Sequence, residues 1–236
     1  MLKELPIVEY AAWWILRAAM LITAVYFSVS DKPVYARNIV LLNTLATFAI
    51  PILRFISPKA LFTADISFRT QTYIDIFILM GSFLGHGLEF LGKINEYDKI
   101  MHFVAGAVVV FIGAEVLKAF KGYENISPSI KTFCGVGFSF IFIVLWENME
   151  FLADWLITDS TNQGYNVSPE ADDLFVRIFG FGKNLPEQAP VYDTNVDMLF
   201  AVVGAIIFAG VLYCVLSHKE KAKAEKTKEA EVVHAE

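Results

Sequence analysis

Residues 132–154 read TFCGVGFSFIFIVLWENMEFLAD, an apolar run that ends in acidic side chains. Glu147, Glu150 and Asp154 are spaced i, i+3 and i+7, so a helix places all three carboxylates on one face. A membrane helix seldom carries a carboxylate, and those that it carries usually face the interior of a bundle. The stretch therefore predicts a membrane helix with a polar site where its acidic face meets other helices.

The composition of the whole chain favours a membrane protein. Of its 236 residues, 56% are hydrophobic and 14% are aromatic, and the mean hydropathy is +0.52. A soluble domain of this length is less apolar. The formal net charge of -6 gives no indication of nucleic-acid binding. Cys134 and Cys214 both lie in apolar runs, which favours packing roles over a disulfide or a metal site.

Apolar runs separated by polar turns predict an all-α fold, a polytopic membrane helix bundle of about six transmembrane helices. Pro51 is expected to kink the second of these spans. The longest loop, residues 156–190, contains an apolar segment at 175–181 that predicts a short interfacial helix. We divide the chain into a six-helix transmembrane domain, residues 1–217, and a charged cytoplasmic tail, residues 218–236. The predicted spans are residues 10–30, 36–56, 70–92, 98–120, 129–155 and 191–217.

The distribution of Lys and Arg residues predicts the orientation. With six spans, both termini lie on the same side of the membrane. The loops and tail on that side carry more Lys and Arg residues than the loops on the opposite side. The positive-inside rule therefore predicts a multi-pass protein of the inner or plasma membrane with both termini in the cytoplasm.

This topology brings polar side chains from four helices to the outer end of the bundle. Helix ends are wet and collect polar residues without any function, which is one interpretation. The repeated i, i+3 and i+4 spacings favour another, in which paired ligands face inward as in the metal sites of helix bundles. The group comprises His86 and Glu89, Asp98 and His102, Glu147, Glu150 and Asp154, and Asp193 and Asp197.

Electrostatics limits what such a group can be. Two like charges about 4 Å apart repel each other by roughly 4 kcal/mol at an effective dielectric constant of about 20. Seven carboxylates beside Lys99, the nearby fixed cation, must hold protons, open to water or bind a cation. Mixed histidine and carboxylate ligands suit Zn, Mn or Fe, and an oxygen-dominated subset suits Mg. A divalent metal is therefore the expected cofactor.

Different roles are expected for different members of the group and for three further charged residues within the spans. Arg17, inside the first span, is expected to snorkel to the membrane surface or to form an internal ion pair. At the inner depth, Asp75 is expected to form an interhelical hydrogen bond and Glu115 to reach interfacial water. The predicted metal ligands are His86, Glu89, Asp98, His102, Glu150 and Asp154, and the predicted catalytic residues are Glu147, Glu150, Asp193 and Asp197.

Three segments carry a family resemblance. Residues 97–103 read YDKIMHF, residues 146–151 read WENMEF, and residues 192–198 read YDTNVDM. Together with Gly204 and Ala205 they resemble the YjdF-like inner-membrane proteins (DUF2238), a family of unknown function, over residues 71–209. They are similar, more distantly, to VanZ-like membrane proteins, which are associated with glycopeptide tolerance.

Two positions depart from the family pattern, since Phe151 stands where a tryptophan is expected and Asn195 where a glutamine is usual. Neither departure changes an acidic residue. The resemblance implies a polytopic protein with a polar site at the outer face, and it implies no particular reaction.

Two classes of function remain open. The first is a metal-dependent hydrolase or transferase that acts on lipid headgroups or lipid-linked envelope precursors at the outer leaflet. The alternative is an ion- or proton-coupled transporter, or a non-catalytic membrane module whose acid cluster is protonated or binds a cation. A transporter is expected to have related halves with broken helices, and the sequence shows no internal repeat. It also contains no P-loop, dinucleotide-binding or nucleophile-elbow motif.

Overall fold

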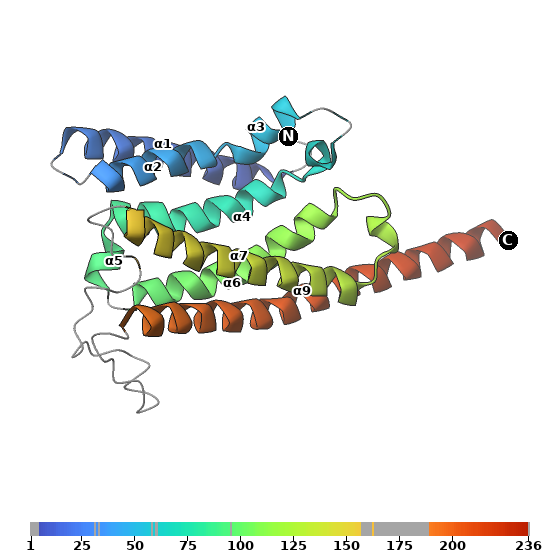
Figure 1. The fold of residues 1–236 in the computed structure, drawn as a ribbon. Helices are drawn as coiled ribbons and strands as arrows, with labels where there is room; N and C mark the ends of the chain where they lie inside the picture. The colour runs from blue at the N-terminus through green and yellow to red at the C-terminus, as the bar shows by residue number, and fades with distance from the viewer. Residues whose placement is uncertain are drawn as a thin grey trace.

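The computed structural model describes residues 5–156 apart from residues 31, 33, 58, 60 and 95, together with residue 162 and residues 189–235. Every regular element in this part of the chain is a helix, and most of the helices run along one common direction (Figure 1). The predicted all-α membrane helix bundle is confirmed. Four of the described helices are long and apolar enough to cross a membrane, and a bent helix pair raises the number to five. The count of six spans stays a prediction.

The first two predicted spans form an N-terminal hairpin. α1 (Ile7–Val29) packs against α2 (Val34–Ala46), and α3 (Ala49–Ile56) continues the second span after a bend of 54°. The break lies at residues 47–48, one turn before the predicted kink. Pro51 itself lies in the first turn of α3, where the N–H that proline lacks would have no partner within the helix.

The third predicted span changes geometry half-way along. α4 (Arg69–Ile78) passes directly into the π-helix η2 (Leu79–Gly87). Glu89 then adopts the left-handed conformation, with φ 62, and the short α5 (Phe90–Lys93) follows. Because a left-handed residue cannot continue a right-handed helix, the span predicted over residues 70–92 ends before Glu89.

Two buried side chains satisfy the backbone groups that the α2–α3 break exposes. Arg17 donates from Nη2 and Nε to the Thr47 carbonyl oxygen, at 2.6 and 3.2 Å. Gln71 of α4 donates from Nε2 to the Ala46 carbonyl at 3.1 Å and accepts from the Ile50 N–H at 2.9 Å. Arg17 is therefore buried and bound to backbone, and the expectation that it snorkels is wrong, because the break offers its guanidinium a carbonyl acceptor.

The last three long helices form the other half of the bundle. α6 (Tyr97–Leu117) and α7 (Pro128–Leu156) run antiparallel, and α9 (Ala189–Ala235) returns beside α6 in the same direction (Figure 1). α7 and α9 contain the fifth and sixth predicted spans, and α6 covers residues 98–117 of the fourth, which is predicted to run to residue 120. The connections include two short 3₁₀ helices, η1 (Phe62–Asp65) and η3 (Tyr123–Asn125).

Glycine residues let α6 and α9 approach backbone to backbone. A Cβ atom on Gly106 would lie 1.9 Å from the Ala201 carbonyl oxygen, and one on Gly204 would lie 2.1 Å from that of Phe103. Ser139 of α7 donates from Oγ to the Gly106 carbonyl at 3.0 Å, which ties the third helix to the crossing. Small residues of this kind drive close helix association in membranes. The crossing therefore fixes the spacing between the first turns of α6 and α9.

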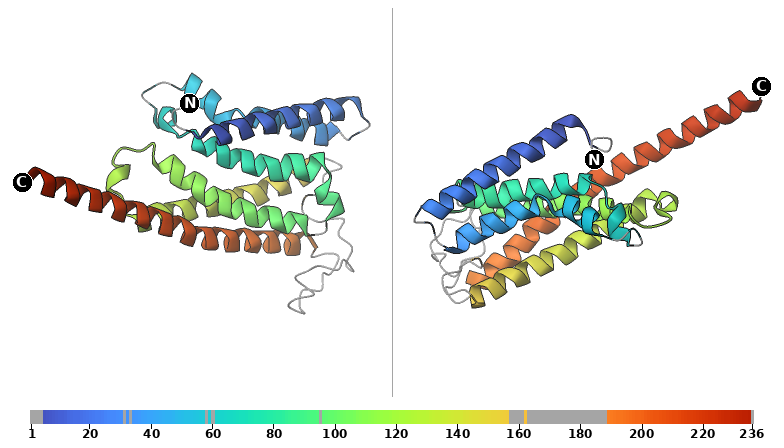
Figure 2. Two further views of the ribbon diagram at one scale, coloured as in Figure 1. Left: turned by 180° about the vertical axis from the view of Figure 1, so that it is seen from behind. Right: turned by 90° about the horizontal axis from the view of Figure 1, so that it is seen from above.

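The tail continues α9 as one helix that projects beyond the bundle (Figure 2). Lys223 Nζ lies 3.2 Å from Oε2 of Glu124, which belongs to η3. The predicted domain boundary at residue 217 falls inside this helix, and the division into domain and tail stays a prediction. The interfacial helix predicted at residues 175–181 lies outside the described residues.

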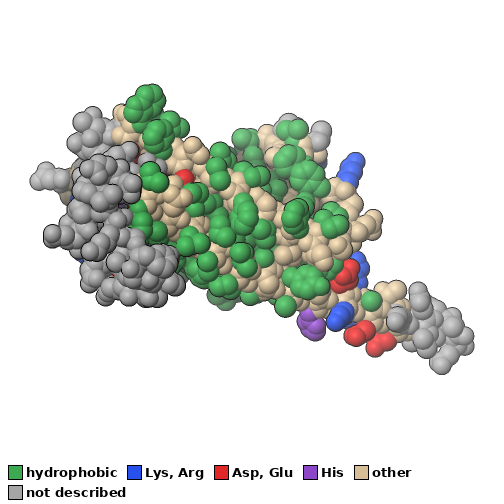
Figure 3. Space-filling view, turned by 60° about the horizontal axis from the view of Figure 1, so that its bottom comes forward, with side chains coloured by type: hydrophobic (Ala, Val, Ile, Leu, Met, Phe, Trp, Pro, Cys, Tyr) green, Lys and Arg blue, Asp and Glu red, His purple; other side chains and the backbone are tan. Residues whose placement is uncertain are grey.

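Apolar side chains cover the outside of the bundle. Those of Ile15 and Ile22 on α1, and of Phe133, Ile141 and Leu145 on α7, are each more than half exposed. Figure 3 shows such side chains across the middle of the molecule, with charged side chains gathered toward the tail. Lipid is the solvent that suits this surface, because exposing so many apolar side chains to water would cost free energy.

Candidate functional site

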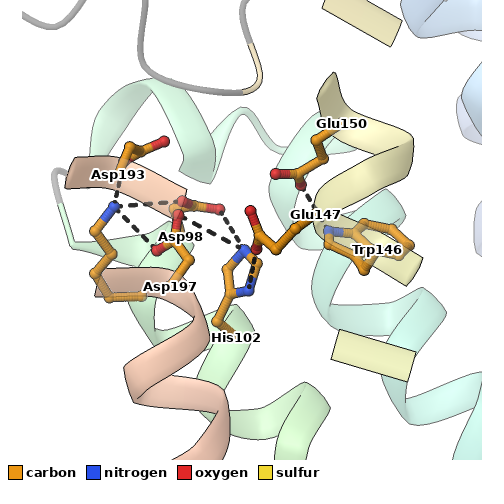
Figure 4. A network of polar contacts seen from close by, with 8 residues as sticks. Asp98, His102, Trp146, Glu147, Glu150, Asp193 and Asp197 are labelled. Carbon is orange, nitrogen blue, oxygen red and sulfur yellow. Dashed lines mark hydrogen bonds and ion pairs between the residues drawn. The ribbon is translucent and has the colours of Figure 1, made fainter. Parts of the chain in front are cut away.

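Three helix ends meet at one end of the bundle: the start of α6, the end of α7 and the start of α9 (Figure 1). Each brings polar side chains that are one turn apart, and these side chains point toward one another (Figure 4). With Lys99, we call them the acid–histidine cluster. Its predicted members are Asp98 and His102 from α6, Glu147 and Glu150 from α7, and Asp193 and Asp197 from α9.

His102 lies at the centre of the cluster and is only 5% exposed. Its Nδ1 atom faces Glu147 Oε1 at 3.5 Å. Its Nε2 atom faces Asp98 Oδ1 at 3.7 Å and Asp197 Oδ2 at 3.9 Å. All three distances exceed the roughly 2.7–3.2 Å of a normal N–H···O hydrogen bond. The imidazole ring thus separates two groups of carboxylates, one facing each ring nitrogen.

Lys99 supplies a fixed positive charge on the Nε2 side. Its Nζ atom lies 2.7 Å from Asp193 Oδ1, 3.1 Å from Asp197 Oδ1 and 3.6 Å from Asp98 Oδ2. Three carboxylates therefore share one ammonium group.

The Nδ1 side has no such cation among the described residues. Both oxygens of Glu147 are buried and accept no hydrogen bond of normal geometry, although Thr194 interacts with this carboxylate from α9. Glu150 Oε1 accepts a hydrogen bond of 2.6 Å from Trp146 Nε1. The Trp146 ring stacks on Phe142 with centroids 5.9 Å apart, so the donor to Glu150 is itself held in place.

Two sets of atoms in the cluster could each hold a metal ion. One set is His102, Glu147 and Glu150, and the other is Asp98, His102 and Asp197. Within each set the candidate ligand atoms lie within 4.8 Å of one another. His102 belongs to both sets, with one ring nitrogen facing each.

An apolar cavity of ≈ 10 Å³ adjoins His102. This volume is about that of a single water-sized probe. The cavity shows that the packing next to the ring is incomplete on its apolar side. Its lining is Phe77, Met101, His102, Ala105, Phe142, Ile143, Trp146 and Ala201.

Three predicted ligands lie outside the cluster. His86 belongs to the π-helix η2 and to neither ligand set. Glu89 pairs with Lys32 and with Lys93, the latter at 3.2 Å. The hydrogen bond from Lys32, with a second from Lys93, lowers the pKa of the Glu89 carboxyl from its ordinary value. Asp154 Oδ1 accepts from the backbone N–H of Asn162 at 2.8 Å, beside the long loop.

The acids at the opposite depth also make contacts that differ from those expected. Asp75 Oδ1 accepts from Gln71 Nε2 at 2.6 Å, one turn earlier in the same helix rather than across helices. Glu115 is buried and pairs with Lys118, instead of reaching interfacial water.

Trp146, which orients Glu150, has no role predicted from the sequence. The available signal was its position four residues before that acid, since residues at i and i+4 meet on one helix face.

Comparison with known proteins agrees with the motifs. Residues 11–218 match a family described as predicted membrane protein (DUF2238). The chain belongs to this family. A relative in Thermotoga maritima, described as an uncharacterized protein, is 25% identical over 151 residues, which cover 63% of this chain and 64% of the relative. The chain thus spans less than two thirds of that relative's length.

No solved structure matches this DUF2238 protein. The predicted YjdF-like membership is confirmed, and the more distant similarity to VanZ-like proteins stays a prediction. The protein is an integral membrane protein with several apolar helices and a buried group of carboxylates around a histidine.

Proposed function

We propose that this DUF2238 protein is a metal-dependent hydrolase or transferase that acts on lipid headgroups or lipid-linked envelope precursors. His102, Glu147 and Glu150 would hold one divalent ion, which could be Zn, Mn, Fe or Mg. The Glu147 carboxylate carries the proposal: it is 5% exposed, accepts no hydrogen bond of normal geometry and faces His102 Nδ1. Such a buried carboxylate is destabilising unless it binds a cation or a proton.

The spacing of the ligand atoms supports a metal. Bonds of about 2.1 Å in tetrahedral geometry place neighbouring ligand atoms about 3.4 Å apart. The distance of 3.5 Å between His102 Nδ1 and Glu147 Oε1 fits that spacing. Three protein ligands also leave a fourth position for water or substrate, as in catalytic zinc sites.

The residues around this position support catalysis as well as binding. A bound divalent ion would polarise a phosphoryl or acyl oxygen and lower the pKa of a bound water. Trp146 holds Glu150 by its hydrogen bond, and an oriented carboxylate is a better ligand than a mobile one. Asp193 and Asp197, held by Lys99, are the remaining candidates for a general base.

The depth of the cluster supports a lipid substrate. Asp98 is the second residue of α6 and Asp193 the fifth of α9, so both lie near helix ends, where headgroups meet the hydrocarbon core.

We also propose that both termini lie in the cytoplasm and that this end of the bundle faces outward across an inner or plasma membrane. The excess of Lys and Arg residues on the terminal side supports this orientation. Cys134 and Cys214 would be replaced by alanine, and a single cysteine placed at residue 162 would be labelled with an impermeant maleimide. Labelling in intact cells is expected, and labelling only after permeabilisation would reverse the orientation.

Metal analysis and turnover test the function together. Detergent-purified protein is expected to contain about one equivalent of metal, which Glu147→Gln and Glu150→Ala should lose. Glu115→Gln is the matched control, because Glu115 is a buried acid in α6 outside the cluster. In mixed micelles with phospholipids or an isoprenoid diphosphate, Glu147→Gln should lower turnover by about 10²-fold or more. A protein that binds metal but turns over none of these lipids would contradict the enzymatic role.

A second candidate, an ion- or proton-coupled transporter, is favoured by one observation at the opposite depth. The α2–α3 break lies beside Asp75, which is buried and whose Oδ2 atom has no hydrogen-bond partner among the described residues. Broken helices with buried carboxylates form coupling-ion sites in transporters. Proton flux into proteoliposomes, abolished equally by Asp75→Asn and Glu147→Gln, would favour this candidate over the enzyme.

A further inference from the structure

Lys99 lies where a cation is needed on the Nε2 side of His102. Three carboxylate oxygens, from Asp98, Asp193 and Asp197, lie within 3.6 Å of its Nζ atom. The Lys99 side chain is 15% exposed and that of Asp197 is 1% exposed, so solvent ions screen these charges little.

The same side of His102 also carries a set of metal ligands. Asp98 Oδ1 and Asp197 Oδ2 are the oxygens that face His102 Nε2 rather than Lys99. Together with Nε2 they lie within 4.8 Å of one another. Asp197 Oδ2 is buried and accepts no hydrogen bond from the described residues. The ring therefore has a ligand set on each side, and among the described residues only the Nε2 side also contains a lysine.

We propose that Lys99 is a built-in cation that occupies the second position of a two-cation centre. The native protein then binds one divalent ion, at His102, Glu147 and Glu150. It gains a second divalent site, at Asp98, His102 and Asp197, when the charge of Lys99 is removed. This inference rests on the proposed metal site.

The physical reason is charge balance. The Lys99 ammonium offsets part of the charge of three carboxylates and repels a divalent ion placed among the same oxygens. A neutral side chain leaves those carboxylates without a fixed cation. A second ion would then bind His102 Nε2, the Nε2–H proton would pass to solvent, and the imidazolate would bridge two ions.

Lys99 also determines which nitrogen of His102 is free to bind the ion at the first site. It holds Asp197 and Asp98 next to Nε2, and a carboxylate that faces one ring nitrogen keeps the proton there. The lone pair of Nδ1 then faces Glu147 and the proposed ion.

The test is the number of manganese ions bound by Lys99→Met, with Lys99→Arg as the matched control that keeps the charge. Elemental analysis after equilibration with Mn²⁺ is expected to give about one ion for the wild type and for Lys99→Arg, and about two for Lys99→Met. The EPR spectrum of Lys99→Met should show coupling between two Mn²⁺ ions. Adding Asp197→Asn to Lys99→Met should return the count to that of the wild type.

The outcomes separate this inference from the proposed function. A folded Lys99→Met protein that binds no more Mn²⁺ than the wild type overturns the role of Lys99, whatever the wild type binds. A wild type that binds no Mn²⁺ or other divalent ion contradicts the first metal site, while a gain of one ion by Lys99→Met still supports the second. If Lys99→Met fails to insert into the membrane, the Mn²⁺ count can be made on Lys99→Gln instead. The amide of that variant is neutral and can still donate a hydrogen bond to Asp193.

Discussion

The two halves of this protein each bury a group of polar side chains, and the groups are satisfied in different ways. In the N-terminal half, Arg17 and Gln71 direct their hydrogen bonds to backbone groups at the α2–α3 break. In the C-terminal half, both carboxylate oxygens of Glu147 and Oδ2 of Asp197 are buried and accept no hydrogen bond of normal geometry, while Asp197 Oδ1 pairs with Lys99 at 3.1 Å. Both groups lie among apolar helices, where unsatisfied polar atoms are costly.

The contrast shows when a buried charge in a membrane bundle marks a binding site. Arg17 needs no ligand to explain it, because it completes a backbone that the fold has broken. Glu147 is explained only when something positive lies beside it. Burial alone therefore does not indicate a site, whereas buried acceptors that converge on a histidine do.

The largest expected effect on stability comes from removing hydrogen bonds in the N-terminal half. Gln71→Leu removes the partners of the Ala46 carbonyl and the Ile50 N–H, and each buried backbone group left unpaired costs roughly 1–3 kcal/mol. The free energy of unfolding in detergent should fall by that sum, with or without metal. Wild-type stability in Gln71→Leu would show that the break does not depend on this side chain.

Glu147→Gln, unlike Gln71→Leu, should lower stability relative to the wild type only when metal is present. Without metal, the variant should be as stable as the wild type or more stable, because a neutral amide replaces a buried carboxylate whose neighbours His102 and Thr194 supply no fixed positive charge. With metal, the wild type should gain about 2.7 kcal/mol at a hundredfold excess over Kd, and the variant should gain nothing. Melting curves with Mn²⁺ and with a chelator measure both. A variant that loses stability in the presence of chelator would show that Glu147, like Gln71, stabilises the fold without a metal.

Gly204→Ala should disturb the cluster from a distance. Its Cβ would lie 2.1 Å from the Phe103 carbonyl oxygen, so α6 and α9 must separate. Overpacking of this kind costs roughly 1–3 kcal/mol. Metal affinity should fall as well, because Asp197 on α9 would move away from His102 Nε2 on α6 and would no longer orient the ring. Gly210→Ala is the control on the same helix, since nothing lies within 4 Å of its added Cβ. Equal melting temperatures for the two variants would show that the close α6–α9 contact does not stabilise the protein.

The smallest effect is expected at Glu89, a predicted ligand that lies outside the cluster. Its contacts with Lys32 and Lys93 lower the pKa of the carboxyl below the ordinary value of 4.5. The ionised carboxylate therefore stabilises the fold above that pH, and this stabilisation is lost as the pH falls through the lowered pKa. Glu89→Gln should remove this acid-side loss and leave metal content unchanged. Reduced metal content in the variant would show that Glu89 is a metal ligand after all.

The part of the site on α6, α7 and α9 could be predicted because its sequence signals are local. Each of these helices is a long apolar run with acids one turn apart near one end. Alternating helix directions then bring those ends together. His102 and Asp98, four residues apart, could be placed on one face without knowing any partner.

The rest could not be predicted, because it depends on departures from regular helix geometry. The π-helix η2 changes the angle between successive side chains, so the face expected to contain His86 and Glu89 is not continuous. The α2–α3 break contains neither proline nor glycine at residues 47–48. It is stabilised by Arg17 and Gln71, which lie 30 and 25 residues away from their carbonyl partners. Tertiary hydrogen bonds of this kind leave no local pattern.

The length of α9 gives the molecule a built-in lever. Its 47 residues extend about 70 Å at about 1.5 Å per residue, whereas the hydrocarbon core of a bilayer is about 30 Å thick. Asp193 and Asp197 lie near one end, and the tight contact at Gly204 acts as the fulcrum. A few degrees of tilt at that fulcrum would move the far end by several ångströms. A fluorophore on the tail would thus report, well outside the membrane, on movements too small to see beside His102.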